Sequence, residues 1–170
     1  MGTINSTRLD GELLYQIISQ RPDYSFVFTG PEDDGFRQHR IHSLKNAYFT
    51  GQKKVDELPA YITAYDVCIN PQMVNDITDG NYPLKIDEYL AMGKPTVATS
   101  THTMRHIFAD HTHLATNPEE WLSAIDRAVT EADDKELAKQ RIAFAETHSW
   151  GHSVKKIYGI IDNFLKEKAT

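Results

Sequence analysis

The chain has 170 residues, enough for one domain with a sizeable core, and its 40% hydrophobic and 25% charged residues are typical of a globular protein. Its formal net charge of −6, without a basic tract, argues against nucleic acid as a partner. A lone cysteine, Cys68, excludes an internal disulfide and favours a reducing compartment, the cytoplasm. No apolar run reaches the ~20 residues of a transmembrane helix, and the polar first ten residues do not form a signal peptide.

Helical and strand patterns alternate along the chain. A helix is expected over residues 8–20, where leucine and isoleucine recur every three or four positions. Short β-branched and apolar runs predict five strands, near residues 26–29, 47–50, 66–70, 95–98 and 112–115. Further helices are expected over residues 56–65, 83–92, 117–132 and 133–147, and from 149 onward. This alternation predicts a doubly wound, Rossmann-like α/β domain, with helices on both faces of a parallel sheet.

One of these helices has the features of a phosphate-binding helix start. Pro83 suits the first helical position, because its ring fixes φ and its missing N–H group would have no partner there. The next three backbone N–H groups also lack partners within the helix, and the helix dipole favours an anion beside them. These groups belong to Leu84, Lys85 and Ile86. Glu88 lies about one turn further on, where it could also form an exposed ion pair with Lys85.

The residues PLKIDEYLAMGKPTVAT, at 83–99, resemble the nucleotide-sugar-binding segment of the GT-B glycosyltransferases, specifically the retaining family four, or group 1. The segments LPAYITAYDVCINPQ and HSWGHSVKKIYGIIDNFL resemble the carboxyl-terminal domain of the same family. The resemblance therefore covers about residues 2–165. It implies that residues 1–170 are a single domain, the donor-binding half of a hexosyltransferase-type enzyme of polysaccharide biosynthesis. The acceptor-binding amino-terminal Rossmann domain would be absent, so the fragment alone would be inactive.

The resemblance also implies roles for individual residues. The donor, a UDP- or GDP-sugar, would place its diphosphate on the backbone N–H groups of Leu84 and Lys85, with Arg8 and Gly2 nearby. Glu88 would hydrogen-bond the ribose. The residues expected near the nucleotide base are Lys53 and Lys54. For Arg8 and these two lysines, an ordinary solvated charge remains the alternative.

The chain departs from the family where the donor sugar binds, because the glutamate usual eight positions before Glu88 is here Gly80. The residues expected at the sugar are Asp79, Gly80, Asn81 and Tyr82. No catalytic acid or base can be assigned, since in this family these groups lie largely in the other domain. No metal or other cofactor is expected, because the helix dipole and basic groups would stabilise the leaving diphosphate.

Several alternatives remain open. The Gly80 departure is compatible with a degenerate, non-catalytic nucleotide-sugar-binding or scaffold domain. Another Rossmann-type nucleotide-sugar enzyme would need a Gly-x-Gly-x-x-Gly turn that the sequence lacks. A zinc site could be sought among His102, His106, His111 and His113, but no cysteine lies near them. Peripheral membrane contact through the absent domain is a further alternative.

The strand count carries one more expectation. A domain of this family would have six strands, the first of them central in the sheet and ending just before the position of Gly2. Only five are predicted here, so the first central strand would be truncated or missing. Its neighbours would then have unpaired backbone groups facing the gap.

Overall fold

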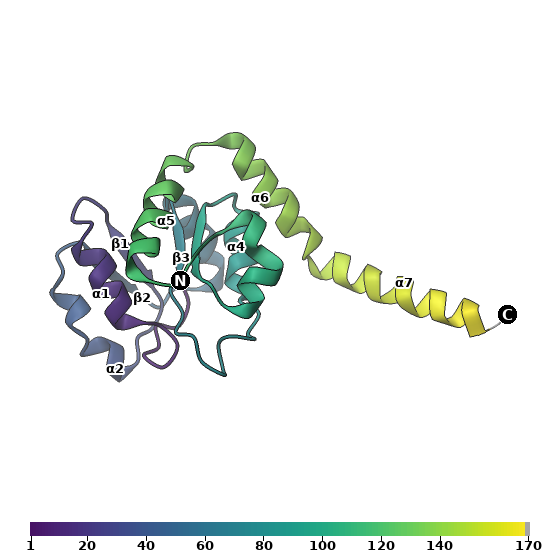
Figure 1. The fold of residues 1–170 in the computed structure, drawn as a ribbon, viewed down its shortest axis with the longest axis horizontal. Coiled ribbons are helices and arrows are strands. Elements are labelled where there is room, and N and C mark those ends of the chain that lie inside the picture. The colour runs from purple at the N-terminus through teal and green to yellow at the C-terminus, as the bar shows by residue number, and fades with distance from the viewer. Residues whose placement is uncertain (169–170) are drawn as a thin grey trace.

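The structure, a computed structural model that describes residues 1–168, has the predicted alternation of strands and helices (Figure 1). The five strands are β1 (Phe26–Thr29), β2 (Ala47–Gly51), β3 (Cys68–Asn70), β4 (Thr96–Thr99) and β5 (His113–Ala115). The longer helices are α1 (Gly11–Ser19), α3 (Leu58–Ala64), α4 (Leu84–Ala91), α5 (Pro118–Thr130), α6 (Lys135–Thr147) and α7 (Trp150–Lys168). Single turns occupy the connections: α2 (Asp34–Arg37), η1 (Arg40–Ser43), η2 (Val55–Glu57), η3 (Met104–Phe108) and η4 (Ala109–His111).

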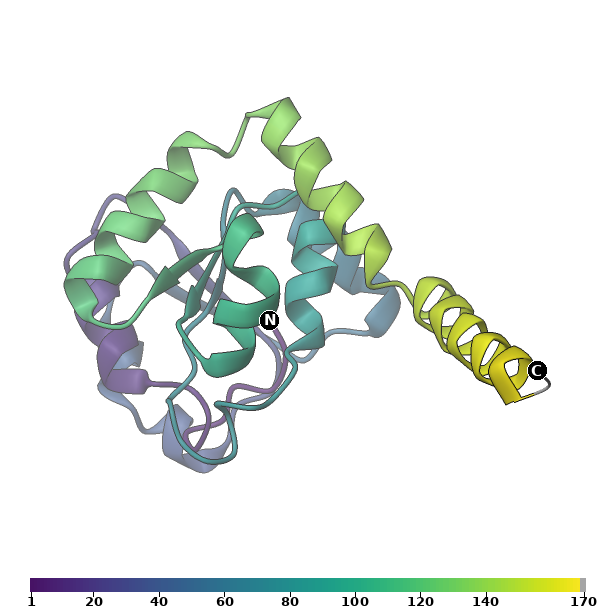
Figure 2. The ribbon, with the colours of Figure 1, turned by 45° about the vertical axis from the view of Figure 1, so that its right-hand side comes forward.

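Helices cover both faces of the strands, which confirms the doubly wound prediction (Figure 2). Side chains of α1 and α5 form one apolar cluster with Val97 of β4, and side chains of α3, α4 and α6 form another with Ala98. Val97 and Ala98 are both fully buried. Successive residues of a strand point to opposite faces, so β4 is covered on each side.

The strands form two separate parallel sheets rather than one. β1 pairs with β2, and β3, β4 and β5 pair in that order. Within residues 1–168 no ladder joins β1 to β3, and the space between them is a cavity of about 420 Å³. Residues 1–4 line its end and run parallel to the chain that leaves β1, where the Gly2 N–H donates to Thr29 O at 2.9 Å. The cavity therefore occupies the place of the predicted missing central strand.

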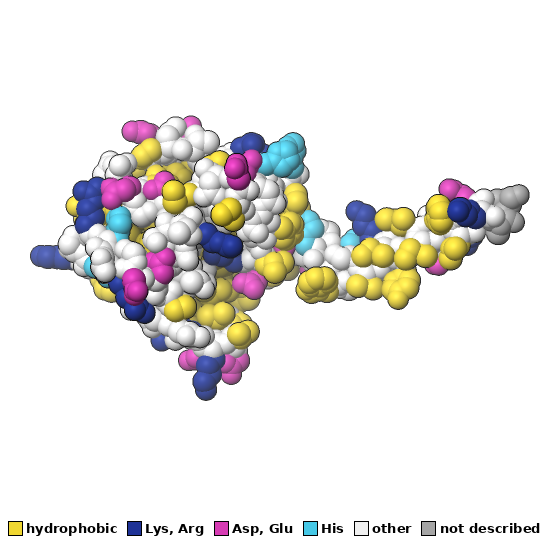
Figure 3. Space-filling view, turned by 90° about the horizontal axis from the view of Figure 1, so that it is seen from below, with side chains coloured by type: hydrophobic (Ala, Val, Ile, Leu, Met, Phe, Trp, Pro, Cys, Tyr) yellow, Lys and Arg dark blue, Asp and Glu magenta, His cyan; other side chains and the backbone are white. Residues whose placement is uncertain are grey.

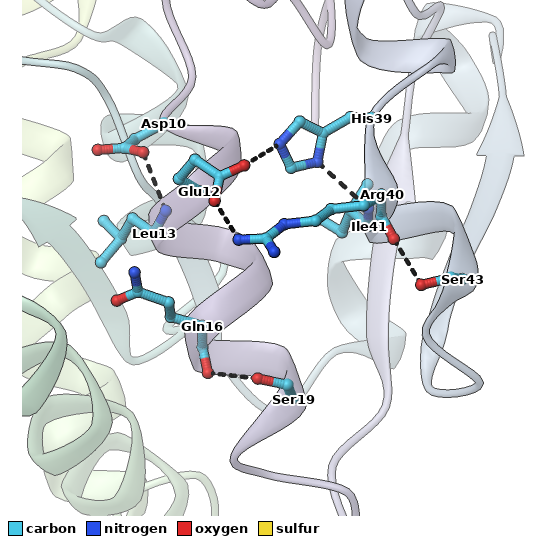
Figure 4. A network of polar contacts seen from close by, with 9 residues as sticks. All are labelled: Asp10, Glu12, Leu13, Gln16, Ser19, His39, Arg40, Ile41 and Ser43. Atoms are coloured by element: carbon cyan, nitrogen blue, oxygen red, sulfur yellow. Dashed lines mark hydrogen bonds and ion pairs between the residues drawn. The ribbon is translucent and has the colours of Figure 1, made fainter.

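A polar network anchors α1, the helix that follows the segment carrying Gly2 and Arg8 (Figure 4). Glu12 pairs through one oxygen with Arg40 and through the other with His39 Nε2 at 3.0 Å. The hydrogen bond from Arg40 is the main cause that lowers the pKa of Glu12. The network ties the start of α1 to η1.

Helix α7 extends away from the rest of the protein (Figure 1). None of its residues is buried, and its apolar stripe is exposed (Figure 3). The large apolar residues of this stripe are Trp150, Val154, Ile157, Tyr158, Ile160, Ile161, Phe164 and Leu165. Across residues 1–168, no helix has the length and hydropathy needed to cross a membrane.

Candidate functional site

The start of α4 offers two free backbone donors rather than the three expected. The helix begins at Leu84, and Pro83 is its N-cap, with φ −86° and ψ 88° and no side-chain capping bond. The prediction that Pro83 is the first helical residue is therefore wrong by one position. The prediction of a free amide on Ile86 is also wrong, because this N–H donates to Pro83 O at 2.8 Å in a tighter first turn. For the N–H groups of Leu84 and Lys85, the structure of residues 1–168 records no partner.

The Lys85 side chain extends back toward the first residues of the chain. A Cβ placed on Gly2 would lie 3.5 Å from Lys85 Nζ. Burial lowers the pKa of Lys85; Glu88 opposes this shift, and the nearby positive charge of Arg8 adds to it. The structure thus gathers Gly2, Arg8, Lys85 and Glu88 from two segments about 80 residues apart. Two cationic groups and two free amides beside a helix dipole suit an anion of high charge.

Glu88 is exposed on the second turn of α4. The structure of residues 1–168 records no ion pair between its carboxylate and Lys85, although the two charges influence each other. The surface ion pair between Glu88 and Lys85, which was the alternative, is therefore not formed in the described residues. A carboxylate in this position can accept hydrogen bonds from a pair of hydroxyl groups.

Two of the four residues expected at the donor sugar form hydrogen bonds through their side chains. The Asp79 carboxylate accepts a hydrogen bond from the backbone N–H of His102 at 2.7 Å, and so fastens the loop before α4 to the loop after β4. The Tyr82 hydroxyl donates to Asp87. Gly80 and Asn81 are exposed, and a Cβ added to Gly80 would meet no atom within 4 Å. The departure from the family glutamate leaves open space at this position.

The two lysines expected near the base lie apart from this cluster, after β2. Lys53 Nζ is 5.4 Å from the centre of the Tyr61 ring, a cation–π distance. Lys54 is exposed, and its backbone N–H donates to Glu57 Oε2 at 2.8 Å. In residues 1–168 no contact links either lysine to Lys85, and their role at the base stays a prediction.

Sequence reasoning missed two polar side chains at the same edge of the sheet. Asn70 is the last residue of β3 and Thr99 the last of β4. They are 2% and 7% exposed, and among residues 1–168 neither Asn70 Oδ1 nor Thr99 Oγ1 has a hydrogen-bond partner. Ligands bind outside the carboxyl ends of parallel strands, so a polar residue closing each strand was the available signal.

The four histidines do not converge on one point. The His102 and His106 rings lie 4.2 Å apart, whereas His111 packs on Phe144 and His113 pairs with Glu131. Across the described part of the chain, no group of three or more His, Cys, Asp or Glu side chains could hold a metal ion.

Comparison with known sequences identifies a family. The family model described as "Glycosyl transferases group 1" matches residues 12–131. TuaH of Bacillus subtilis (strain 168), whose name places it in teichuronic acid biosynthesis as a glycosyltransferase, is 27% identical over 157 residues. That alignment covers 88% of this chain and 39% of TuaH.

Solved structures share the fold at low identity. Sucrose-phosphate synthase (tll1590) from Thermosynechococcus elongatus superposes with a TM-score of 0.71 at 16% identity, over 98% of this chain and 46% of that one. Anabaena Alr3699/HepE, solved in complex with UDP, gives 0.69 at 14% identity, over 95% and 48%. WaaG, a glycosyltransferase involved in lipopolysaccharide biosynthesis, gives 0.62 at 14% identity, over 86% and 42%. The chain thus spans less than half the length of each of these relatives.

Proposed function

Because the chain belongs to the group 1 glycosyltransferases, we propose that it binds the nucleotide diphosphate sugar from which such an enzyme transfers a glycosyl group. The main support for this proposal is the geometry at the start of α4. Within residues 1–168 the backbone N–H groups of Leu84 and Lys85 have no partner there, and the Lys85 side chain lies near Gly2 and the charge of Arg8. Glu88 would accept hydrogen bonds from the ribose hydroxyls. The UDP complex of Alr3699/HepE, which shares this fold, favours a UDP-sugar over a GDP-sugar.

The chemistry proposed for this domain is electrostatic. As the glycosyl bond breaks, negative charge develops on the leaving diphosphate, and preorganised N–H groups and cations stabilise that charge. Lys85 and Arg8 would supply the cationic groups, so the proposal requires neither a metal ion nor another cofactor. Transfer would proceed with retention at the anomeric carbon.

The acceptor would be bound by a second, amino-terminal Rossmann domain, and this chain alone would be inactive. Two observations support this part of the proposal. The chain spans less than half of its relatives, and α7 exposes an apolar stripe that has no cover within residues 1–168. Contact with a membrane would come through that second domain, and the cytoplasmic location remains a prediction.

A binding domain without transfer is the second candidate. The observation that favours it is the open space at Gly80, together with the engagement of the Asp79 carboxylate by His102. Such a domain would bind the nucleotide diphosphate as tightly as an active transferase domain does, but it would leave the sugar without a carboxylate contact.

Isothermal titration with UDP and GDP tests the proposed site. Leu84→Pro removes one free donor while its φ stays compatible with a first helical turn, and Leu84→Ala is the matched control that keeps the donor. We expect the proline variant to weaken UDP binding roughly 10- to 100-fold, because a hydrogen bond to a charged group contributes about 1.5–3 kcal/mol, and the alanine variant to change it by less than about twofold.

The ribose contact is tested in the same assay. Glu88→Ala should weaken UDP and uridine alike, by about 1–3 kcal/mol, because it removes hydrogen bonds that both ligands make. Failure of the unaltered chain to bind either nucleotide diphosphate would overturn the proposed function. Equal losses in Leu84→Pro and Leu84→Ala would show that the amide is not a ligand.

A further inference from the structure

Three polar side chains form a continuous hydrogen-bonded chain beside the candidate site. The Tyr82 hydroxyl donates to Asp87 Oδ2 at 2.6 Å, and His148 Nδ1 lies 2.9 Å from Asp87 Oδ1. A carboxylate only accepts, so His148 carries a proton on Nδ1 and donates it. Burial, together with Asp87, raises the pKa of Tyr82, so the phenol keeps the proton that it donates. Both oxygens of Asp87 are thus engaged.

This Tyr82–Asp87–His148 chain joins parts of the protein that are distant in sequence. Tyr82 lies in the loop before α4, Asp87 in the first turn of α4, and His148 at the C-cap of α6, 61 residues further on. Aromatic packing orients both ends. The Tyr82 ring lies 5.4 Å from that of Phe108, and the His148 ring meets Phe144 edge-on at 4.5 Å. The contacts are therefore built into the packing of α4 against α6.

The start of α4 is held by the buried side chains of Pro83 and Ile86, but it has no side-chain cap. Pro83, the N-cap, makes no side-chain hydrogen bond to the first turn. Tyr82 precedes it directly, and its hydroxyl reaches forward to Asp87 in that turn. This bond ties the loop to the helix start, and so orients the free amides of Leu84 and Lys85.

We propose that His148 is a positioning residue of the donor site: by holding Asp87, it keeps Tyr82 and the start of α4 in the arrangement that binds the diphosphate. The inference rests on the proposed function. Diphosphate binding would then depend on the junction between α6 and α7, because His148 lies two residues before α7 begins.

The test compares UDP affinities of variants that differ in one donor. His148→Asn places an amide N–H near the position of Nδ1, whereas His148→Leu has a similar size and no donor; both lose the ring. We expect His148→Leu and Tyr82→Phe each to weaken UDP binding roughly three- to tenfold, and His148→Asn to change it by less than about twofold. His148→Leu and Tyr82→Phe both act through Asp87, so the double variant should lose no more affinity than about the larger of the two single losses.

Two controls separate positioning from a general loss of structure. His111→Leu removes another ring that packs on Phe144, at 4.1 Å, and has no bond to Asp87, so it should bind UDP as the unaltered chain does. Uridine lacks the diphosphate, and its affinity should be the same in His148→Leu as in the unaltered chain. If uridine and UDP weaken equally, or if His148→Asn loses as much as His148→Leu, the inference is wrong.

The remaining outcomes distinguish this inference from the proposed function. An unaltered chain that binds UDP, together with a His148→Leu variant of unchanged affinity, overturns the positioning role alone. An unaltered chain that does not bind UDP overturns the proposed function, and this inference with it. If His148→Leu does not fold, Tyr82→Phe decides the question, since it removes a single oxygen from a residue that is 37% exposed.

Discussion

Gly30→Ala tests the placement of residues 1–4, which carry Gly2 to the candidate site. Gly30 has φ +144°, a conformation that a side chain rarely adopts, and a Cβ there would lie 1.9 Å from the carbonyl oxygen of Gly2. Real Cβ contacts stay above 3.0 Å, so that carbonyl would have to move by about 1 Å. The move would strain or break the hydrogen bond from the Gly2 N–H to Thr29 O.

The expected loss of stability follows from the backbone strain at residue 30 and the weakened hydrogen bond. Backbone strain costs about 1–2 kcal/mol and the hydrogen bond about 1 kcal/mol, so Gly30→Ala should lower the free energy of unfolding by roughly 2–3 kcal/mol. For a chain of this size that loss corresponds to a fall in Tm of roughly 4–12 °C, measured by circular dichroism. The matched control is Gly159→Ala, where the added Cβ meets nothing within 4 Å. In the middle of α7, alanine is the better helix former, so the control should not lower Tm.

If Gly30→Ala melts within about 1 °C of the unaltered chain, residues 1–4 do not lie against the end of β1. The proximity of Gly2 to Lys85 would then be wrong as well. The same variant should weaken UDP binding, because the displaced segment is the one that faces Lys85.

Two further predictions concern buried charges. Because burial lowers the pKa of Lys85, its ammonium loses its proton sooner than an exposed lysine does, and UDP affinity should fall as pH rises from about 8 to about 10. Lys85→Arg, which stays charged, should keep its affinity over that range, and a flat titration for the unaltered chain would exclude Lys85 as a phosphate ligand. Arg141 is 6% exposed and pairs with Glu131, so Glu131→Ala should cost about 3 kcal/mol in urea denaturation by leaving a buried cation unpaired. Arg141→Met should cost clearly less, because Glu131 keeps His113 at 3.0 Å, and equal losses would contradict this asymmetry.

Much of the fold was predictable because its signals are local. The run from Phe26 to Thr29 is apolar and β-branched, and it forms a strand over the expected residues. Asn117 followed by Pro118 predicts a helix start, and the Asn117 side chain does accept a hydrogen bond from the Glu120 N–H. Counting strands against the family pattern also predicted the missing central strand. In the structure, a cavity lies between β1 and β3, at the position of that strand.

The details of the candidate site depended on contacts that no local pattern contains. A helical period cannot reveal that the first turn of α4 tightens and takes the Ile86 amide out of the site. Nor can it reveal that Asp79 is used to hold His102. The local sequence patterns predicted the class of fold and, through the resemblance, the family; donor binding at α4 remains a proposal. The proximity of Lys85 to Gly2 and the contact of His148 with Asp87 could not be predicted, because these pairs lie 83 and 61 residues apart in the chain and come together only in the folded protein.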